Sequence, residues 1–323
     1  MIGDSLGFGF WLLEFNCVAI NKMHRVNGMV ERVPVSVYVL TTNNRRTIER
    51  CLKSLSWAEE LVVVDSFSQD GTYETCKPYT DKVFQRKWTG HRDQYQYAAD
   101  LTTRDWIMFV DADEEIPSEL AEEIRTELNG RAKELDGYFV YRRTYYLGRW
   151  IRYGGWYPDG EIRLYRREKG RWEGGLHAKL VMDGEIGVLK NQYHHYTYGN
   201  ISDQIQTIDK YSKIAAADLF DSGEKFSLLK LLFHPPFRFV KEYLFKLGFR
   251  DGLPGFIIIV STMFYVFIKY AKLWELTHST TPSPSFEEKI ESRRSGSTLS
   301  EPQAFGGEAE GLTISQKEKK NGS

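Results

Sequence analysis

The most informative segment of the chain reads Trp106-Ile107-Met108-Phe109-Val110-Asp111-Ala112-Asp113. Its continuous apolar run is typical of a strand buried on both faces of a parallel sheet, and two carboxylates follow where that strand ends. Similar strands are expected at Val35–Leu40 and Leu61–Val64, and helical periodicity is found at Thr47–Leu55 and Gln94–Leu101. This alternation predicts an open, mostly parallel, Rossmann-like α/β sheet with helices on both faces.

Polar clusters follow all three predicted strands. They are Thr41-Thr42-Asn43, Asp65-Ser66 and Asp111-Ala112-Asp113. Open α/β sheets bind ligands beyond the carboxyl ends of their strands. We therefore expect the three clusters to lie together at one edge of the sheet and to line a binding site.

The two carboxylates of Asp111 and Asp113 are candidate ligands for one hard cation. Mg²⁺ and Mn²⁺ prefer oxygen ligands and commonly bind substrate phosphates as well. A competing interpretation is structural, because Asp113, Glu114 and Glu115 precede a predicted helix and favour its positive end. For Asp65 the functional reading is a hydrogen bond to a nucleobase or ribose, and the alternative is a simple turn.

The segments Val35–Thr42, Leu61–Thr72 and Trp106–Glu115 together resemble the inverting glycosyltransferase family 2, whose fold is called GT-A. Four later segments resemble the bacterial branch of that family that adds β-linked glucose to the lipopolysaccharide inner core. These segments are Tyr145–Ile151, Pro158–Arg167, His194–Tyr198 and Gly248–Gly252. The resemblance covers roughly residues 34–276, and its motifs specify the family better than the sugar or the acceptor.

The resemblance implies roles for several side chains. Thr41 and Asn43 would line the nucleotide pocket, Asp65 would contact the base, and Gln94 would face the nucleotide. Asp111 would lie near the ribose and the metal, Asp113 would bind the metal, and His177 would be a third metal ligand or a diphosphate contact. A structural role is the alternative for His177. Where the family often has Gln-Arg-Asn, this chain has Gln94-Tyr95-Gln96, so Arg92 or Lys87 is a candidate to replace the missing arginine.

An inverting transfer needs a carboxylate that deprotonates the acceptor hydroxyl. Asp159 is the first candidate because it lies in a glycine-rich loop beside aromatic residues, Glu161 is the second and Glu173 the third. The alternative for Asp159 is an ordinary Pro-Asp-Gly turn. His194 and His195 are adjacent, so on a strand they would point to opposite faces and only one could face a site.

Composition limits the remaining possibilities. The net charge is −1, the three cysteines form no CxxC pair, and no nucleic-acid-binding module is recognisable. These features predict a reduced, cytoplasmic protein without a zinc site. Arginines are concentrated between Arg142 and Arg171, which fits either a solvated face or a surface for phosphorylated lipid or anionic membrane.

The expected organisation is an irregular extension (1–33), a GT-A domain (34–235), membrane-associating helices (236–279) and a disordered tail (280–323). Within the GT-A domain, residues 34–130 form the nucleotide-sugar half and residues 131–235 the acceptor half. The uncharged stretch Leu253–Ile268 is shorter than the roughly 20 residues that span a bilayer, so we expect a helix lying on the inner membrane. A buried core helix is the alternative.

Together these features predict an inverting glycosyltransferase that uses Mg²⁺ or Mn²⁺. Its expected donor is UDP-glucose, and its expected acceptor is a lipid-linked saccharide such as the lipopolysaccharide inner core. Two alternatives stay open. In the first, the acceptor is polyprenyl phosphate or an exopolysaccharide precursor. In the second, the protein is a non-catalytic sensor or scaffold that binds nucleotide sugars.

Overall fold

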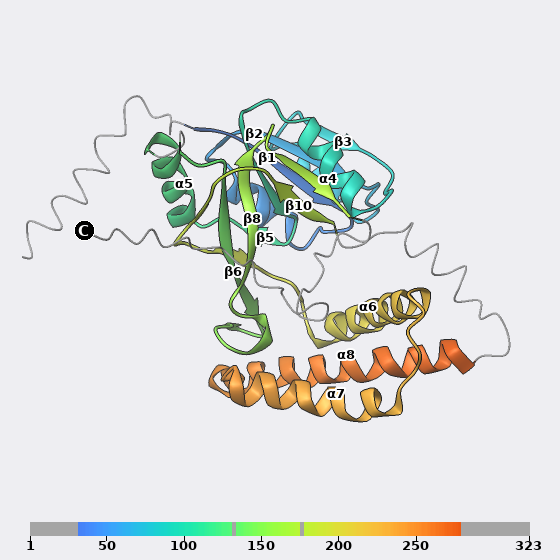
Figure 1. The fold of residues 1–323 in the computed structure, drawn as a ribbon. Helices are drawn as coiled ribbons and strands as arrows, with labels where there is room; N and C mark the ends of the chain where they lie inside the picture. The colour runs from blue at the N-terminus through green and yellow to red at the C-terminus, as the bar shows by residue number, and fades with distance from the viewer. Residues whose placement is uncertain (1–31, 131–133, 175–177, 279–323) are drawn as a thin grey trace, which may run out of the picture. The chain divides into compact units, whose positions relative to one another are not determined.

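The computed structural model describes residues 32–130, 134–174 and 178–278. The chain divides into two compact units (Figure 1). Among the described residues, the first comprises 32–140 and 162–191, and the second comprises 141–161 and 192–278. The expected extension and tail, and His177, lie outside the described residues, apart from Arg32 and Val33.

The first unit is built on a mixed sheet in the order β3-β2-β1-β4-β8-β6, with β11 beside β6. Its strands are β1 (Val33–Thr41), β2 (Ala58–Asp65), β3 (Val83–Gln85), β4 (Trp106–Asp111), β6 (Gly137–Tyr146), β8 (Asp159–Arg166) and β11 (Ile186–Val188). Strands β1 to β4 are parallel, and β8 runs antiparallel to β4. The short strand β5 (Glu114–Glu115) and the hairpin of β9 (Gly170–Glu173) and β10 (Lys179–Met182) complete the strands of this unit.

Among the described residues of this unit, the helices beside the sheet are α2 (Ile48–Ser54), α3 (Thr72–Cys76), α4 (His91–Asp100) and α5 (Ser118–Gly130). Every residue of β1 except Pro34 is buried, so both faces of the strand are covered, as its continuous apolar run predicted. One face packs Tyr38 and Leu40 against Ala98 and Ala99 of α4. Helix α4 begins after Gly90, whose φ of 132° is accessible to glycine and strained for other residues.

Strand β6 runs from the first unit into the second, and β8 begins in the second unit and runs into the first. Strand β12 (Tyr193–His195) pairs parallel with β6, and β7 (Arg149–Trp150) pairs antiparallel with it. A 3₁₀ turn, η1 (Gly154–Trp156), precedes β8. The buried side chains of Tyr146, Trp156 and Tyr198 form a cluster with residues of the following helices.

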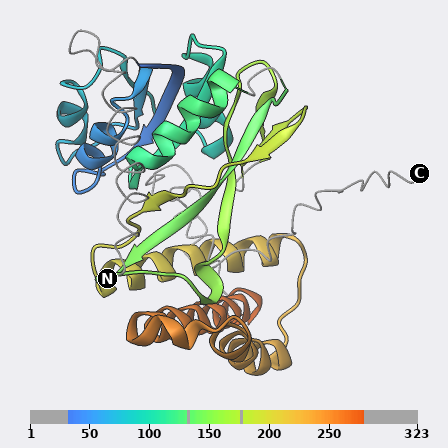
Figure 2. The same ribbon diagram turned by 90° about the vertical axis from the view of Figure 1, so that its left-hand side faces the viewer.

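Helices make up the rest of the second unit. They are α6 (Ile201–Asp221), α7 (Leu228–Val240), the π-helical turn η2 (Lys241–Phe245), the 3₁₀ turn η3 (Gly248–Asp251) and α8 (Gly252–His278). Figures 1 and 2 both show α7 and α8 side by side. Helix α8 buries Ile258, Ile259 and Tyr265, and it contacts both α6 and α7.

Helix α7 begins at Leu228, earlier than the membrane-associating helices that the sequence predicted from residue 236. Pro235 and Pro236 lie inside it, and proline normally interrupts a helix because it lacks an N–H and crowds the preceding turn. The helix begins with Ser227 as its N-cap, whose hydroxyl accepts a hydrogen bond from the backbone N–H of Lys230. Packing against α8 on one side therefore compensates for the two prolines.

Candidate active site

The carboxyl ends of β1, β2 and β4 meet at one edge of the sheet in the first unit. Thr41 at the end of β1 is the register partner of Asp65 at the end of β2. On the other side of β1, Leu40 is the partner of Asp111 at the end of β4. The predicted convergence of the three polar clusters is confirmed, and it places them where open α/β sheets bind ligands.

Hydrogen bonds join the loops that follow β1 and β2. The backbone N–H of Asn43 donates to Ser68 Oγ over 2.8 Å, and Asn43 Oδ1 accepts from the backbone N–H of Gln69 over 2.8 Å. Asn43 has a φ of 53°, in the left-handed region that asparagine tolerates better than most residues. Thr41 is fully buried, and its hydroxyl donates to Asn44 Oδ1. The loops after β1 and β2 are thus joined into one rim at the carboxyl edge of the sheet.

Asp65 is fully buried and organises this rim. Its Oδ2 accepts from the backbone N–H of Ser68 (3.0 Å) and from Nε2 of Gln85 (3.1 Å), while the Ser68 hydroxyl donates to Oδ1. The structure therefore shows a loop-ordering role for this carboxylate. Its contact with a nucleobase stays a prediction.

Gln94 brings an unsatisfied acceptor to the same region. Its Nε2 donates to Ser66 Oγ over 3.0 Å and lies 3.4 Å from the carbonyl of Arg86. The side chain is fully buried, and within the described part of the chain its Oε1 accepts no hydrogen bond. A buried acceptor without a donor costs about 1–3 kcal/mol, so this oxygen indicates a place where a ligand N–H or O–H would be stabilising.

Asp111 lies at the centre of a hydrogen-bonded cluster. Tyr95 donates its phenolic O–H to Asp111 Oδ1 over 2.8 Å, and Nη2 of Arg163 lies 3.6 Å from Asp111 Oδ2. The Arg163 side chain is 1% exposed and forms a shorter ion pair, 2.8 Å, with Glu114 Oε1. Glu114 Oε2 in turn accepts from the backbone N–H of Asp111.

Aromatic packing holds Tyr95 and Arg163 in place. The ring of Tyr95 stacks on Trp172 with centroids 4.2 Å apart, and it meets Phe109 edge to face at 5.6 Å. The guanidinium of Arg163 lies 4.0 Å from the centre of the Phe109 ring. Tyr95 replaces the arginine that the family resemblance led us to expect. The candidate substitute Arg92 is more than half exposed and pairs with Asp93, so Arg163 is the guanidinium that reaches Asp111.

Three carboxylates are buried in this cluster, those of Asp111, Asp113 and Glu114, and the Arg163 guanidinium pairs with Asp111 and Glu114. Burial raises the pKa of Glu114 well above its usual range. Arg163 opposes this shift, and the charges of Asp111 and Asp113 add to it. Burial, followed by the charges of the same three carboxylates, raises the pKa of the Cys51 thiol. A bound divalent cation would add positive charge beside these carboxylates.

Asp111 and Asp113 fit Mg²⁺ or Mn²⁺ by their donor chemistry, since both offer hard carboxylate oxygens. Within residues 32–130, 134–174 and 178–278, no group of three or more His, Cys, Asp or Glu side chains has a metal-binding arrangement. Two carboxylates match the usual way in which Mg²⁺ binds, with water and substrate phosphates supplying the other ligands.

Two of the three base candidates, Asp159 and Glu161, lie in the second unit, whereas Glu173 lies on β9 in the first unit and pairs with Arg171. Asp159 begins β8, and its Oδ2 accepts a hydrogen bond from Nη2 of Arg142, whose side chain is 7% exposed. The ion pair fixes the direction of the Asp159 carboxylate. Glu161 follows two residues later on β8 and is half-buried.

The two adjacent histidines differ in exposure. His195 is buried against Thr197, whereas His194 is half-exposed, so His194 is the histidine that faces outward.

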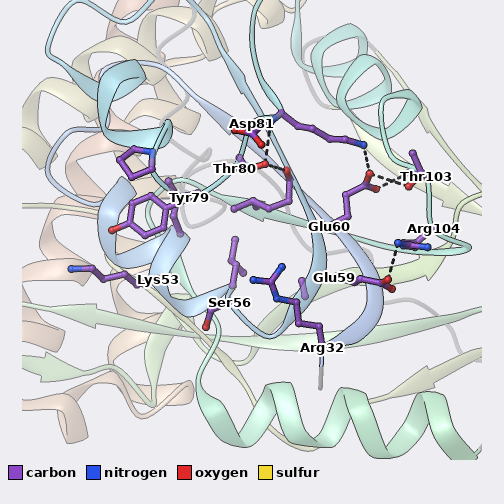
Figure 3. A pocket seen from close by; sticks show the side chains of 16 residues that line it. Arg32, Lys53, Ser56, Glu59, Glu60, Tyr79, Thr80, Asp81, Thr103 and Arg104 are labelled. Carbon is purple, nitrogen blue, oxygen red and sulfur yellow. Dashed lines mark hydrogen bonds and ion pairs between the residues drawn. The ribbon is translucent and has the colours of Figure 1, made fainter. Parts of the chain in front are cut away.

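A separate cavity of about 770 Å³ lies at the opposite ends of the strands (Figure 3). Its lining includes Arg32 and Ala58, which adjoin the starts of β1 and β2. Glu60 at its wall accepts hydrogen bonds from Lys82, Ser36 and Thr103. Its position away from the carboxyl ends of the strands sets it apart from the candidate donor site.

Comparison with known proteins agrees with this geometry. Residues 36–180 match the family described as Glycosyl transferase family 2. The chain is 29% identical over 275 residues to the lipopolysaccharide core biosynthesis glycosyltransferase LpsC of Rhizobium meliloti (strain 1021), covering 81% of this chain and 99% of that protein. It is 28% identical over 261 residues to an uncharacterized glycosyltransferase of Rickettsia typhi, covering 75% of this chain and 87% of that one. A crystal structure of S. aureus TarS aligns with 16% identity and a TM-score of 0.40, covering 76% of this chain and 93% of TarS.

The fold is therefore of the GT-A type, a curled mixed sheet with helices, and a long apolar helix lies near the C-terminus. Residues 36–180 form a family 2 glycosyltransferase domain, and the protein is a glycosyltransferase. The sensor hypothesis is thereby set aside in favour of an enzyme.

Proposed function

We propose that this glycosyltransferase moves a hexose, glucose from UDP-glucose, onto a lipid-linked saccharide such as the lipopolysaccharide inner core, with inversion at the anomeric carbon. The observation that carries the proposal is the convergence of Thr41, Asp65 and Asp111 at one sheet edge. The similarity to LpsC, a protein of lipopolysaccharide core biosynthesis, supports the choice of acceptor.

In this proposal the nucleotide is held by residues of the first unit. Asn43 and Thr41 shape the rim, Asp65 accepts from the base, and the buried Oε1 of Gln94 accepts a further donor of the nucleotide. Asp111 and Asp113 hold Mg²⁺ or Mn²⁺, with His177 as a further candidate ligand. The cation, when bound, supplies Lewis-acid stabilisation of the departing diphosphate.

Asp159 is proposed as the base, with Glu161 as the second choice. The acceptor hydroxyl oxygen attacks the anomeric carbon, the bond from that carbon to the diphosphate oxygen breaks, and the hydroxyl proton passes to the carboxylate. The diphosphate leaves with the bonding electron pair. Arg142 orients the carboxylate for this transfer through its ion pair.

We further propose a cytoplasmic location with peripheral binding to the inner membrane. Helix α7 and turn η2 expose Leu229 (67%), Phe233 (63%), Phe237 (64%) and Phe245 (78%). Between Lys225 and Arg250 the sequence has six basic residues and one acidic residue. Apolar side chains flanked by excess positive charge suit an anionic lipid surface.

Helix α8 contributes fewer exposed apolar side chains to the proposed membrane-binding surface than its hydropathy indicates. On length and composition, Gly248–His278 is the one described helical stretch that could cross a membrane, but 39% of its most apolar window is buried inside the protein. Core helices of soluble proteins pass the same test.

Vesicle sedimentation would test membrane binding through α7. The double variant Phe233→Ser with Phe237→Ser should reduce binding to anionic vesicles, while Val188→Ser, an exposed position in the first unit, should not.

The test of the transferase proposal is product analysis. Purified protein, UDP-glucose and Mn²⁺ would be incubated with O-deacylated lipopolysaccharide core or with polyprenyl phosphate, and the products analysed by mass spectrometry. A mass increase of one hexose on the core supports the proposal. A hexose on polyprenyl phosphate alone would favour the alternative acceptor, and transfer to neither would count against both.

A further inference from the structure

One face of the small sheet in the second unit gathers aromatic and basic side chains. Along β6, residues 142, 144 and 146 are buried, whereas 141, 143 and 145 are half-buried, as expected for a strand with alternating sides. Arg143 and Tyr145 therefore share the outer face. His194 of β12 is the register partner of Arg143, and Trp150 of β7 is the partner of Tyr145.

The aromatic residues on this face contact one another. The ring of Trp150 lies 4.2 Å from that of His194 and 5.1 Å from that of Tyr145, centroid to centroid. Tyr196 is 5.7 Å from Tyr145 and 5.8 Å from Trp150. All four side chains are half-buried, so each leaves part of its surface to solvent. Rings held in this way offer a rigid apolar platform at little entropic cost.

Two guanidinium groups accompany the platform. The guanidinium carbon of Arg143 lies 5.2 Å from the centre of the Trp150 ring. Burial, followed by the charge of Arg152, lowers the pKa of Arg143, while Tyr157 opposes the shift. Within the described part of the chain, neither Arg143 nor Arg152 forms an ion pair with a carboxylate, in contrast to Arg142 and Arg149.

A guanidinium group that no carboxylate neutralises can bind an anion, and Arg143 holds such a group over the Trp150 ring. The adjoining aromatic platform suits the apolar face of a sugar ring. We propose that this face, made by Arg143, Tyr145, Trp150, His194 and Tyr196 with Arg152 beside it, binds an acidic sugar residue of the acceptor, one that carries a phosphate or a carboxylate. This inference rests on the proposed function, because it names the chemical class of the acceptor.

The first experiment measures acceptor binding without catalysis. Calorimetry would follow the binding of O-deacylated lipopolysaccharide core to the full-length protein. Arg143→Gln and Arg152→Gln should each weaken binding about 10- to 100-fold, the range expected for a lost charge-assisted hydrogen bond. Arg152 is exposed, so its variant keeps the test valid if Arg143→Gln fails to fold. Arg167→Gln, an exposed arginine on the turn after β8, is the matched control and should bind normally.

A second pair of probes identifies the anion. The same core would be used after removal of its phosphates, and separately after reduction of its carboxyl groups. The inference predicts that one treatment weakens binding to the wild type and abolishes the difference between wild type and arginine variants. Trp150→Ala should weaken binding of every probe, and Trp150→Phe should restore most of it.

Unchanged binding in both arginine variants would overturn the inference. So would variants that weaken native and both charge-depleted probes equally, since the arginines would then act only through the fold. Because these measurements need no donor, they are independent of the transferase proposal. A wild type that binds core but releases no nucleoside diphosphate would leave this site standing and remove the proposed activity.

Discussion

Tyr95 donates a 2.8 Å hydrogen bond to Oδ1 of Asp111, the first carboxylate of the proposed metal pair. The phenol takes the position where the family resemblance led us to expect an arginine, so a neutral donor orients this carboxylate. The nearby positive charge comes instead from Arg163, on the antiparallel strand β8. Asp111 therefore has one neutral partner, Tyr95, and one charged partner, Arg163.

Removal of the Tyr95 hydroxyl should loosen Asp111 without disturbing the core. Tyr95→Phe keeps the ring that stacks on Trp172 and loses only the hydrogen bond. We expect a 5- to 30-fold higher metal concentration at half-maximal activity, corresponding to about 1–2 kcal/mol, and little change in the free energy of unfolding. A Mn²⁺ titration of initial rates checks this. Tyr97→Phe on the same helix serves as the control, and an equal effect there would refute the assignment.

Arg163 is the residue whose loss should damage stability most. Arg163→Met leaves Glu114 and Asp111 buried without their guanidinium, which should lower the free energy of unfolding by about 3–5 kcal/mol. The double variant Arg163→Met with Glu114→Gln should recover part of that loss. Urea denaturation measures the free energy of unfolding of both variants. A double variant no more stable than the single one would argue against the ion pair between Arg163 and Glu114.

Asp159 should matter for transfer and not for donor binding. Asp159→Asn is expected to reduce kcat about 10²- to 10⁴-fold, the usual contribution of a general base, with the dissociation constant for UDP-glucose unchanged. Glu161→Gln is the comparison, since it is the second candidate. If Glu161→Gln has the larger effect on kcat, the two assignments are reversed.

Glu60 allows a test of the structure through pH. Burial alone would raise its pKa, but hydrogen bonds from Lys82, Ser36 and Thr103 outweigh burial and lower the pKa to about 2 from an ordinary 4.5. A lowered folded-state pKa stabilises the protein above the unfolded value and loses that contribution as pH falls toward the folded value.

Glu60→Gln should therefore lower the free energy of unfolding by about 2 kcal/mol at pH 7. The deficit should shrink between about pH 5 and pH 2, where the wild-type carboxyl becomes protonated. Glu59→Gln, which breaks only an exposed pair with Arg104, should have little effect at any pH. A Glu60→Gln deficit that is independent of pH would show that the carboxylate charge is not responsible.

The sequence predicted the donor half of the fold well because its signals are local. The apolar runs of β1, β2 and β4 could be read directly, and parallel pairing then required their carboxyl ends to meet. The contacts of Arg163 could not be read in this way. They depend on β8 lying antiparallel beside β4, which no local pattern specifies.

Two further features were only partly predicted, for related reasons. Helix α7 contains Pro235 and Pro236, so local rules argue against it, and tertiary packing on α8 decides the outcome. The sequence also left open which histidine faces outward, His194 or His195. The pairing of β12 with β6 settles that question, because it places His194 beside Arg143.

Metal-dependent transfer from UDP-glucose is tested most directly by nucleoside diphosphate release in the presence of Mn²⁺ and core acceptor, measured for the wild type, for Asp113→Asn, and with EDTA. We expect release by the wild type, loss of at least 100-fold (about 2.7 kcal/mol) in Asp113→Asn, and no release with EDTA until Mn²⁺ is restored in excess. Undiminished release by Asp113→Asn, or release that EDTA does not affect, would contradict metal-dependent transfer.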